Sequence, residues 1–476
     1  MPRDGFTSVA IVAVGLATCV TACDPGDAAQ PRPAEVAVAP PRDFVSGTRL
    51  RARFHVVDGL VDVFTTFHDA ELGTDCAYED ANGSSHVGPN ASSYCLPAGM
   101  AGHREERGPY LDSFCKVRGA FMPSTGPATY ALVEPRNACV TAPEIHLVGP
   151  PEVRVVFLKD DSGGCVLANE VSAQAFTGTV PLSTFVRAEE RVERRAGRLG
   201  ARVLVGDDGS QRVVGAYDWD REEASRVGLS PDGSRRWLPA RAAFVGGGDL
   251  LFSDAACGVP VAAKIARTAT CPLQAAVVLE GSCGGGNYFV LGGPITSLFT
   301  RDDADKCQVG SSVELLAFAL GAPIPTSVYA QVTAVDIGSS VVRRRGFGGY
   351  GDRPISWGEV VAGTTNEPCE VVAMADGTLR CLPAAAAAVS QFSDAACTAP
   401  AFARTITGCE GGTDARFVTS STGESPRVFE VTQEIRALYT FEADQCVPFI
   451  PTVPSRGFAV REIELTKFPL AVLSAD

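Results

Sequence analysis

An internal repeat of about 142 residues constrains this chain more than any other feature of its sequence. Leu-Pro dipeptides stand 142 and 144 residues apart and begin at Leu96, Leu238 and Leu382. The sequence FSDAAC occurs at Phe252–Cys257 and again at Phe392–Cys397, and LDSFC at Leu111–Cys115 occupies the matching place. A third marker is a cysteine after an acidic turn, at Cys165, Cys307 and Cys446. The markers predict three copies of one unit, at 44–198, 199–346 and 347–470, followed by a C-terminal tail at 471–476.

The local patterns within each copy are those of β-strands. Runs such as RARFHVV, VRVVFLKD and RVFEVTQ are short, rich in Val and Phe, and separated by turn residues. Asp-Gly dipeptides between such runs predict hairpins at Asp208, Asp232 and Asp376. The charged run at 189–197 is the main stretch expected to form a helical turn. About eight strands per copy predict an all-β fold, either a β-propeller of six blades, two per repeat, or three tandem β-sandwich-like domains.

Composition excludes two broad classes of protein. The 476 residues carry 55 acidic and 41 basic side chains, a net charge of −14 that disfavours binding to nucleic acid. The one segment apolar enough to approach a membrane lies at the start of the chain, which excludes a multi-pass membrane protein.

The N-terminus has the pattern of an export signal. Val9–Ala17 is an apolar run behind Arg3 that is too short to span a bilayer. It leads to Val20-Thr21-Ala22-Cys23, which resembles the lipobox of bacterial lipoproteins. That resemblance implies a signal peptide at 1–22 and a lipid on Cys23; plain secretion with cleavage after Ala22 is the alternative. Residues 23–43 are rich in proline and predict an extended tether of about 60 Å.

The cysteines predict disulfides. Of 16 cysteines, Cys19 leaves with the signal and Cys23 would carry lipid, so 14 remain in an exported chain. One pair of positions holds cysteine in the first copy (Cys76 and Cys95) and in the third (Cys369 and Cys381), but Arg226 and Trp237 in the second. Joint presence and joint absence predict the bonds Cys76–Cys95 and Cys369–Cys381.

The other ten cysteines leave an odd number in the first and third copies, so one bond between those copies, or two free thiols, is expected. The simplest scheme pairs neighbours and leaves a clasp: Cys139–Cys165, Cys257–Cys271, Cys283–Cys307, Cys397–Cys409 and the clasp Cys115–Cys446. Other pairings within a copy stay open. No CxxC and no close Cys/His cluster occurs, so no metal site is expected.

No catalytic motif is found, and no catalytic residue, cofactor or metal is assigned. All five histidines lie in the first copy, at His55, His68, His86, His103 and His146. The neighbours His68 and Asp69 form the one suggestive pair, and a structural role is expected for both. Asp254 and Asp394 recur in register within FSDAAC, which favours a turn or cap over a catalyst.

Taken together, the lipobox, the tether and the recurring CLP (95–97 and 381–383) and FSDAAC elements are similar to the cysteine-rich repeat lipoproteins of high-GC diderm bacteria. That uncharacterised family implies attachment to the bacterial cell envelope through the N-terminal lipid, on the periplasmic face or the cell surface. The favoured function is non-enzymatic binding of a protein or glycan partner through loops on a rigid β scaffold. The alternative is an exported, carbohydrate-active hydrolase with its site in a central propeller channel.

Overall fold

The chain is all-β throughout the part that the structure describes. The computed structural model describes residues 42–79, 92–104, 108–123, 126–134, 144–160, 163–194, 197–245, 251–265, 273, 275–279, 286–302, 306–310, 315–348, 354–363, 367–374, 376–383, 391–405, 416–420, 426–442, 445–451 and 455–476. Besides strands, these residues form short 3-10 turns at Leu182–Thr184, Thr326–Val328 and Leu465–Lys467. Within the same ranges no helix has the length and hydropathy needed to cross a bilayer.

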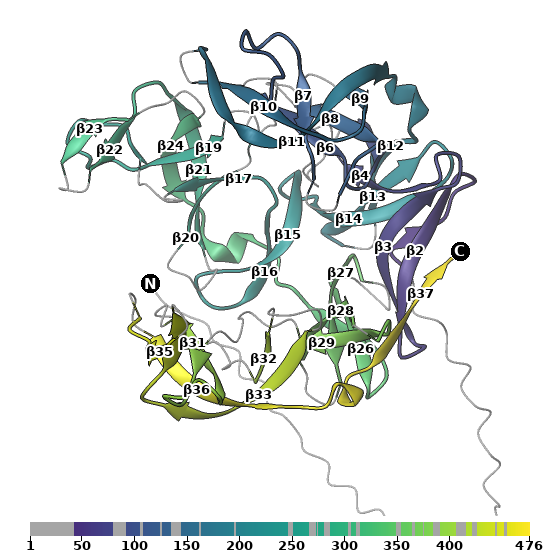
Figure 1. The fold of residues 1–476 in the computed structure, drawn as a ribbon, viewed down its shortest axis with the longest axis vertical. Coiled ribbons are helices and arrows are strands. Elements are labelled where there is room, and N and C mark those ends of the chain that lie inside the picture. Colours follow the sequence, from purple (N-terminus) through teal and green to yellow (C-terminus); the bar gives the residue numbers. More distant parts are fainter. Residues whose placement is uncertain are drawn as a thin grey trace, which may run out of the picture. The chain divides into compact units, whose positions relative to one another are not determined.

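A 16-stranded sheet joins strands from the whole described chain (Figure 1). Its order is β16-β15-β14-β13-β12-β5-β4-β3-β2-β37-β29-β28-β27-β26-β25, and β1 pairs with β14 beside this path. Three antiparallel meanders of four strands make up most of it. The first is β2 (Leu50–Val57), β3 (Val61–Asp69), β4 (Thr74–Glu79) and β5 (Ser92–Pro97); the second is β13 (Leu199–Gly206), β14 (Gln211–Asp218), β15 (Glu223–Leu229) and β16 (Arg235–Pro239); the third is β26 (Val342–Phe347), β27 (Ser356–Ala362), β28 (Glu367–Ala373) and β29 (Leu379–Pro383).

Tight turns explain why these segments fold back on themselves. Gly209, Gly233 and Gly377 have φ angles of 86°, 75° and 77°, which glycine adopts without steric cost. The aspartate before each glycine accepts hydrogen bonds from the backbone N–H and the hydroxyl two residues later: Asp208 from Ser210, Asp232 from Ser234 and Asp376 from Thr378. The hairpins predicted at the Asp-Gly dipeptides are therefore confirmed.

Linking strands connect one meander to the next. The strand β12 (Arg187–Arg194) pairs with both β5 and β13, and β37 (Leu470–Ala475) pairs with both β29 and β2. The strand β25 (Ala334–Gly338) pairs with β26, and the residues just before it bond to β16: Trp237 N–H donates to the Ala330 carbonyl and Val332 N–H to the Arg235 carbonyl. The hydrogen-bonded order of the strands is therefore closed.

A module of further strands follows each meander. The first holds β6 (Ala101–Arg104), β7 (Gly119–Phe121), β8 (Tyr130–Glu134), β9 (Glu144–Val148), β10 (Glu152–Lys159) and β11 (Cys165–Val180). The second holds β17 (Ala242–Val245), β18 (Leu251–Phe252), β19 (Val261–Ile265), β20 (Ala275–Leu279), β21 (Gly286–Ile295), β22 (Phe299–Arg301), β23 (Cys307–Val309) and β24 (Leu315–Pro323). The third holds β30 (Gln391–Phe392), β31 (Pro400–Thr405), β32 (Phe417–Ser420), β33 (Arg427–Ile435), β34 (Tyr439–Glu442), β35 (Gln445–Pro448) and β36 (Ser455–Glu462).

The modules share a way of pairing. Strands β17-β19-β24-β21-β20 form a closed barrel, with β17 and β20 parallel. The first module pairs β7-β6-β8-β9 and closes through β11, with β6 and β8 parallel. In the third module, β31, β36, β33 and β32 lie side by side in the order of β19, β24, β21 and β20 of the second module. They are part of a seven-stranded sheet.

Three sequence-based expectations need correction. The six-bladed propeller is not formed, because the meanders are joined edge to edge in one sheet instead of standing as separate blades. The several sheets are consistent with a β-sandwich arrangement, although β12 and β37 tie the expected copies together. The charged run at 189–197 begins as strand, because β12 is hydrogen-bonded on both edges and turns Ala188 inward. The expected tail at 471–476 supplies most of β37.

Candidate functional site

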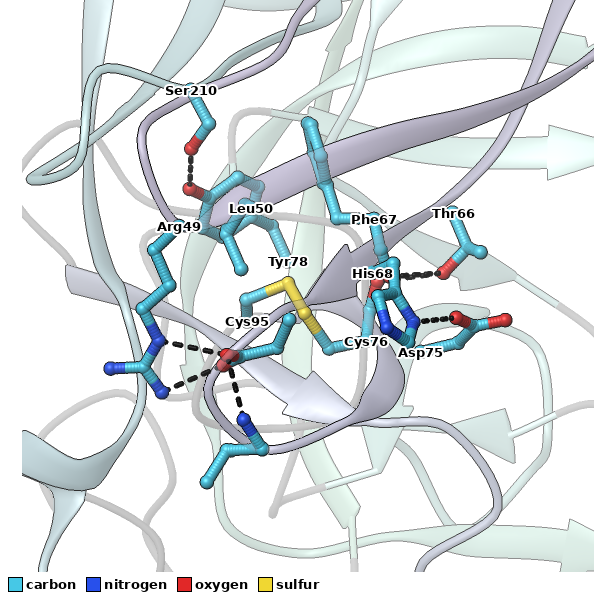
Figure 2. The surroundings of a disulfide bond; sticks show 12 residues. Arg49, Leu50, Thr66, Phe67, His68, Asp75, Cys76, Tyr78, Cys95 and Ser210 are labelled. Carbon is cyan, nitrogen blue, oxygen red and sulfur yellow. Dashed lines mark hydrogen bonds and ion pairs between the residues drawn. A yellow bond between two sulfur atoms is a disulfide. The ribbon is translucent and has the colours of Figure 1, made fainter. Parts of the chain in front are cut away.

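A buried disulfide links the last two strands of the first meander (Figure 2). Cys76 on β4 lies opposite Pro97, and Cys95 on β5 lies opposite Tyr78, which places the two Cα atoms 5.2 Å apart. Neither cysteine has exposed surface, and both pack in a core cluster with Leu50, Ala52, Phe54 and Phe67. In the third meander, Cys369 and Cys381 form the corresponding bond beside Val360 and Ala471. Both predicted pairs are confirmed.

An arginine and an aspartate beside this disulfide form a buried ion pair. The Arg49 guanidinium donates to both oxygens of Asp69, at 2.8 and 2.7 Å, and to the Thr184 carbonyl at 2.7 Å. The same carboxylate accepts the backbone N–H groups of Glu71 and Leu72. Figure 2 shows Arg49 beside the Cys76–Cys95 bond. The network ties the first meander to the 3-10 turn after its module.

The second meander repeats this arrangement. Arg198 donates to both oxygens of Asp218, at 2.7 and 2.6 Å, and to the Val328 carbonyl at 2.7 Å. Asp218 is fully buried, as Asp69 is. Burial lowers the pKa of an arginine, but in both places the bonds to aspartate prevail and raise it. These arginines remain charged, and each ties its meander to a 3-10 turn through a backbone carbonyl.

A tyrosine–serine contact joins the first and second meanders. The hydroxyl groups of Tyr78 and Ser210 lie 2.5 Å apart, and Asp208 accepts the backbone N–H groups of Arg49 and Leu50. Burial raises the pKa of Tyr78 well above its usual value. Burial also opposes ionisation of Asp208, but the hydrogen bonds it accepts outweigh that effect and lower its pKa. Figure 2 shows Ser210 reaching Tyr78 from outside the first meander.

The suggestive pair His68 and Asp69 does not form. Neighbours along a strand point to opposite faces, so His68 turns away from Asp69 and its Nδ1 lies 2.8 Å from Asp75 on the next strand. Arg53 donates to the other oxygen of Asp75 at 2.8 Å (Figure 2 shows His68 and Asp75). The result is a cross-strand cluster of hydrogen-bonded polar side chains on a half-buried sheet face. This cluster could be predicted from the sequence only if the register of β3 and β4 were already known.

The other described histidines occupy different surroundings. His103 is 1% exposed, its Nδ1 bonds the Gly119 carbonyl at 2.7 Å, and its ring packs edge-on against Tyr110 and Phe176. His146 stacks on the Phe176 ring, with the ring centroids 4.4 Å apart. His55 lies on β2, where burial lowers its pKa. His86 lies outside the described residues. Within those residues, no group of three or more His, Cys, Asp or Glu side chains could hold a metal ion.

The remaining disulfide scheme is wrong wherever the structure describes it. Each module bonds its two marker cysteines, in the pairs Cys115–Cys165, Cys257–Cys307 and Cys397–Cys446, with sequence separations of 50, 50 and 49. The predicted clasp Cys115–Cys446 and the bonds Cys139–Cys165, Cys257–Cys271, Cys283–Cys307 and Cys397–Cys409 are therefore excluded. Cysteines that are neighbours in sequence do not pair, because each module folds back on itself. The cysteine after the acidic turn then lies next to the cysteine of the LDSFC or FSDAAC turn. Cys139, Cys271, Cys283 and Cys409, like Cys19 and Cys23, lie outside the described residues.

The first cysteine of each module bond sits in a strained turn. Cys115, Cys257 and Cys397 have φ angles of 51°, 50° and 54°, in the left-handed region. The aspartate three residues earlier caps each turn: Asp112 and Asp254 accept two backbone N–H groups each, and Asp394 accepts three. These backbone bonds lower the pKa of Asp112 and Asp394. The capping role expected for Asp254 and Asp394 is confirmed.

The described part of the chain is thus an all-β protein stabilised by five disulfides, which indicates an oxidising extracellular or envelope environment. It belongs to a family of unknown function, DUF7481, whose model matches residues 37–400. No curated protein and no solved structure matches it.

Proposed function

We propose that this protein is an exported cell-envelope lipoprotein built from three copies of one unit, which binds a protein or glycan partner through the disulfide-held turns of its modules. The lipobox-like sequence before Cys23 supports export and lipidation. The disulfides support life outside the cytoplasm, since thiols in a reducing compartment rarely pair.

The observation that carries the binding function is the surface of the module turns. Phe114, next to Cys115, is 75% exposed, and Val309, the last residue of β23 and two residues after Cys307, is 80% exposed. Val259, two residues after Cys257, is 54% exposed. A large apolar side chain on a turn fixed by a disulfide is preorganised for contact, because little conformational entropy is lost on binding.

Two experiments test the proposal. Labelling of cells with a fatty acid should mark the wild-type protein and not Cys23→Ser, and extracellular protease should reach the body only if it is exported. A photo-crosslinking residue at Phe114 should trap a partner on intact cells, whereas the same residue at exposed Thr65 on the first meander serves as the control. Equal capture at both positions contradicts binding through the turns.

No observation above favours the hydrolase alternative, and the buried carboxylates of Asp69 and Asp218 are each held in an ion pair with an arginine. Turnover of a polysaccharide or ester by the purified protein would contradict the non-enzymatic proposal.

A further inference from the structure

Two arginines from different meanders converge on one carboxylate inside the closed sheet. Arg344 on β26 donates to both oxygens of Asp43 at 3.1 Å, and one of its nitrogens also donates to the Asp62 carbonyl at 2.9 Å. Arg212 on β14 places its Nη1 3.2 Å from the same carboxylate. Asp43 is 5% exposed and the Arg344 side chain 8%.

The carboxylate comes from a short N-terminal segment and not from a meander. Beyond Asp43, β1 (Phe44–Val45) pairs with β14, and Val213 N–H donates to the Asp43 carbonyl. Phe44 is 2% exposed and packs against Phe54 and Phe64. The segment therefore enters the core and delivers one acid to a place lined by two bases.

Two positive charges share one negative charge at this place. Asp43 is shared by two guanidinium groups, and Nη1 of Arg212 makes no hydrogen bond in good geometry among the described residues, although it lies close to Asp43. The Arg212 guanidinium also lies over the Phe64 ring, at 3.9 Å. Burial and the charge of Arg344 lower the pKa of Arg212, against the attraction of Asp43. The Arg212 side chain is 27% exposed, and a cation that shares its counter-ion gains from any further anion that can reach it.

We infer that Arg212 and Arg344 form a carboxylate-binding site within the sheet, which Asp43 fills from the same chain and which accepts a free small carboxylate when the Asp43 side chain is absent. Two guanidinium groups around one carboxylate supply the planar, charge-assisted donors that such a group prefers. The site joins the second meander (Arg212) and the third meander (Arg344) to the N-terminal segment. The bond from Arg344 to the Asp62 carbonyl connects it to the first meander as well. It is independent of whether Cys23 carries lipid.

Chemical rescue of the full chain tests this inference. Asp43→Ala should lower the thermal midpoint in chloride, and added formate or acetate should raise it along a saturating curve, with half or more of the loss recovered. The wild type in the same salts, at matched ionic strength, should change by no more than about one degree. Removal of the Glu434 carboxylate from its exposed pair with Arg456 (Glu434→Ala) is the matched control and should show no specific response.

The opposite results overturn the inference. An unchanged midpoint for Asp43→Ala in chloride, or an equal response to formate in Asp43→Ala and Glu434→Ala, contradicts a built site. The double variant Asp43→Ala/Arg344→Met should lose the response to formate, and retention of that response also contradicts it. Should Asp43→Ala fail to fold in chloride, refolding yield is the readout: recovery in formate supports the site, and no recovery in formate opposes it.

Discussion

Arg49 and Asp69 form a bidentate ion pair in which the aspartate has no exposed surface. Strand register places Asp69 opposite Leu50, Asp218 opposite Leu199 and Ala362 opposite Val342. The third meander therefore has Val341 and Ala362 where the first two have an arginine and an aspartate. One position in the fold accepts either a buried ion pair or an apolar pair.

This comparison predicts strong non-additivity. Asp69→Ala should lower the free energy of unfolding by about 3 kcal/mol, because Arg49 is left partly buried with only the exposed carboxylate of Glu71 beside it. The double variant Arg49→Val/Asp69→Ala, which copies the third meander, should recover most of that loss. Urea unfolding of both variants measures the coupling. A double variant less stable than Asp69→Ala would contradict the expectation.

A second prediction concerns the module disulfides. A non-reducing peptide map should find Cys115–Cys165, Cys257–Cys307 and Cys397–Cys446, and it would also assign the four cysteines outside the described residues. Replacement of Cys115 and Cys165 together by alanine should cost about 2–4 kcal/mol, because the bond closes a loop of about 50 residues. Recovery of the peptide pair Cys115–Cys446 would disprove the assigned connectivity.

A third prediction is a dependence of stability on pH that originates at His103. Burial lowers its pKa, and the charges of Arg118 and His146 add to this effect, while the carbonyls of Gly119 and Pro109 oppose it. The unfolded chain therefore binds a proton more readily than the folded chain, so this contribution is present above about pH 6.5 and is lost as pH falls below it.

The matched variant for this test is His103→Val, since the buried residue 142 positions later is Val245. Thermal midpoints of the wild type and the variant between pH 5 and pH 8 provide the measurement. The wild type should lose more stability than His103→Val on acidification. Parallel curves for the two proteins would assign the acid sensitivity to other groups.

A fourth prediction concerns closure of the sheet by β37. Ala471 is 5% exposed and packs with Val57 and Val342, whereas neighbouring Val472 is 65% exposed. Ala471→Asp should destabilise the protein by about 3 kcal/mol or more, because it buries an unpaired charge between β2 and β29.

Val472→Asp, one residue along the same strand, should change stability by about 0.5 kcal/mol or less. Urea unfolding and size-exclusion chromatography of the two variants separate loss of packing from loss of solubility. Equal destabilisation by both substitutions would mean that β37 packs differently.

Local chemistry explains which expectations succeeded. An Asp-Gly turn is decided by residues that touch one another in sequence, so Asp208, Asp232 and Asp376 could be assigned in advance. Cys76–Cys95 and Cys369–Cys381 could also be paired, because each bond lies within one hairpin. His68 and Asp69 are neighbours in sequence, but the partner of His68 is Asp75, which is decided by strand register. The Arg49–Asp69 pair could not be predicted, because nothing in the sequence distinguishes one buried aspartate among 55 acidic residues.

The sequence by itself determined the period of about 142 residues, the β character and the tight turns, since spacing, side-chain pattern and glycine conformation act over a few residues. Only the tertiary structure decided that the meanders share one sheet, that Cys115 bonds Cys165, and that Asp43 meets Arg212 and Arg344. Each of these depends on strands far apart in the chain lying side by side. Folding brings the partner of a strand edge, a thiol or a buried charge within a few ångströms. Spacing along the chain does not specify which group that partner is.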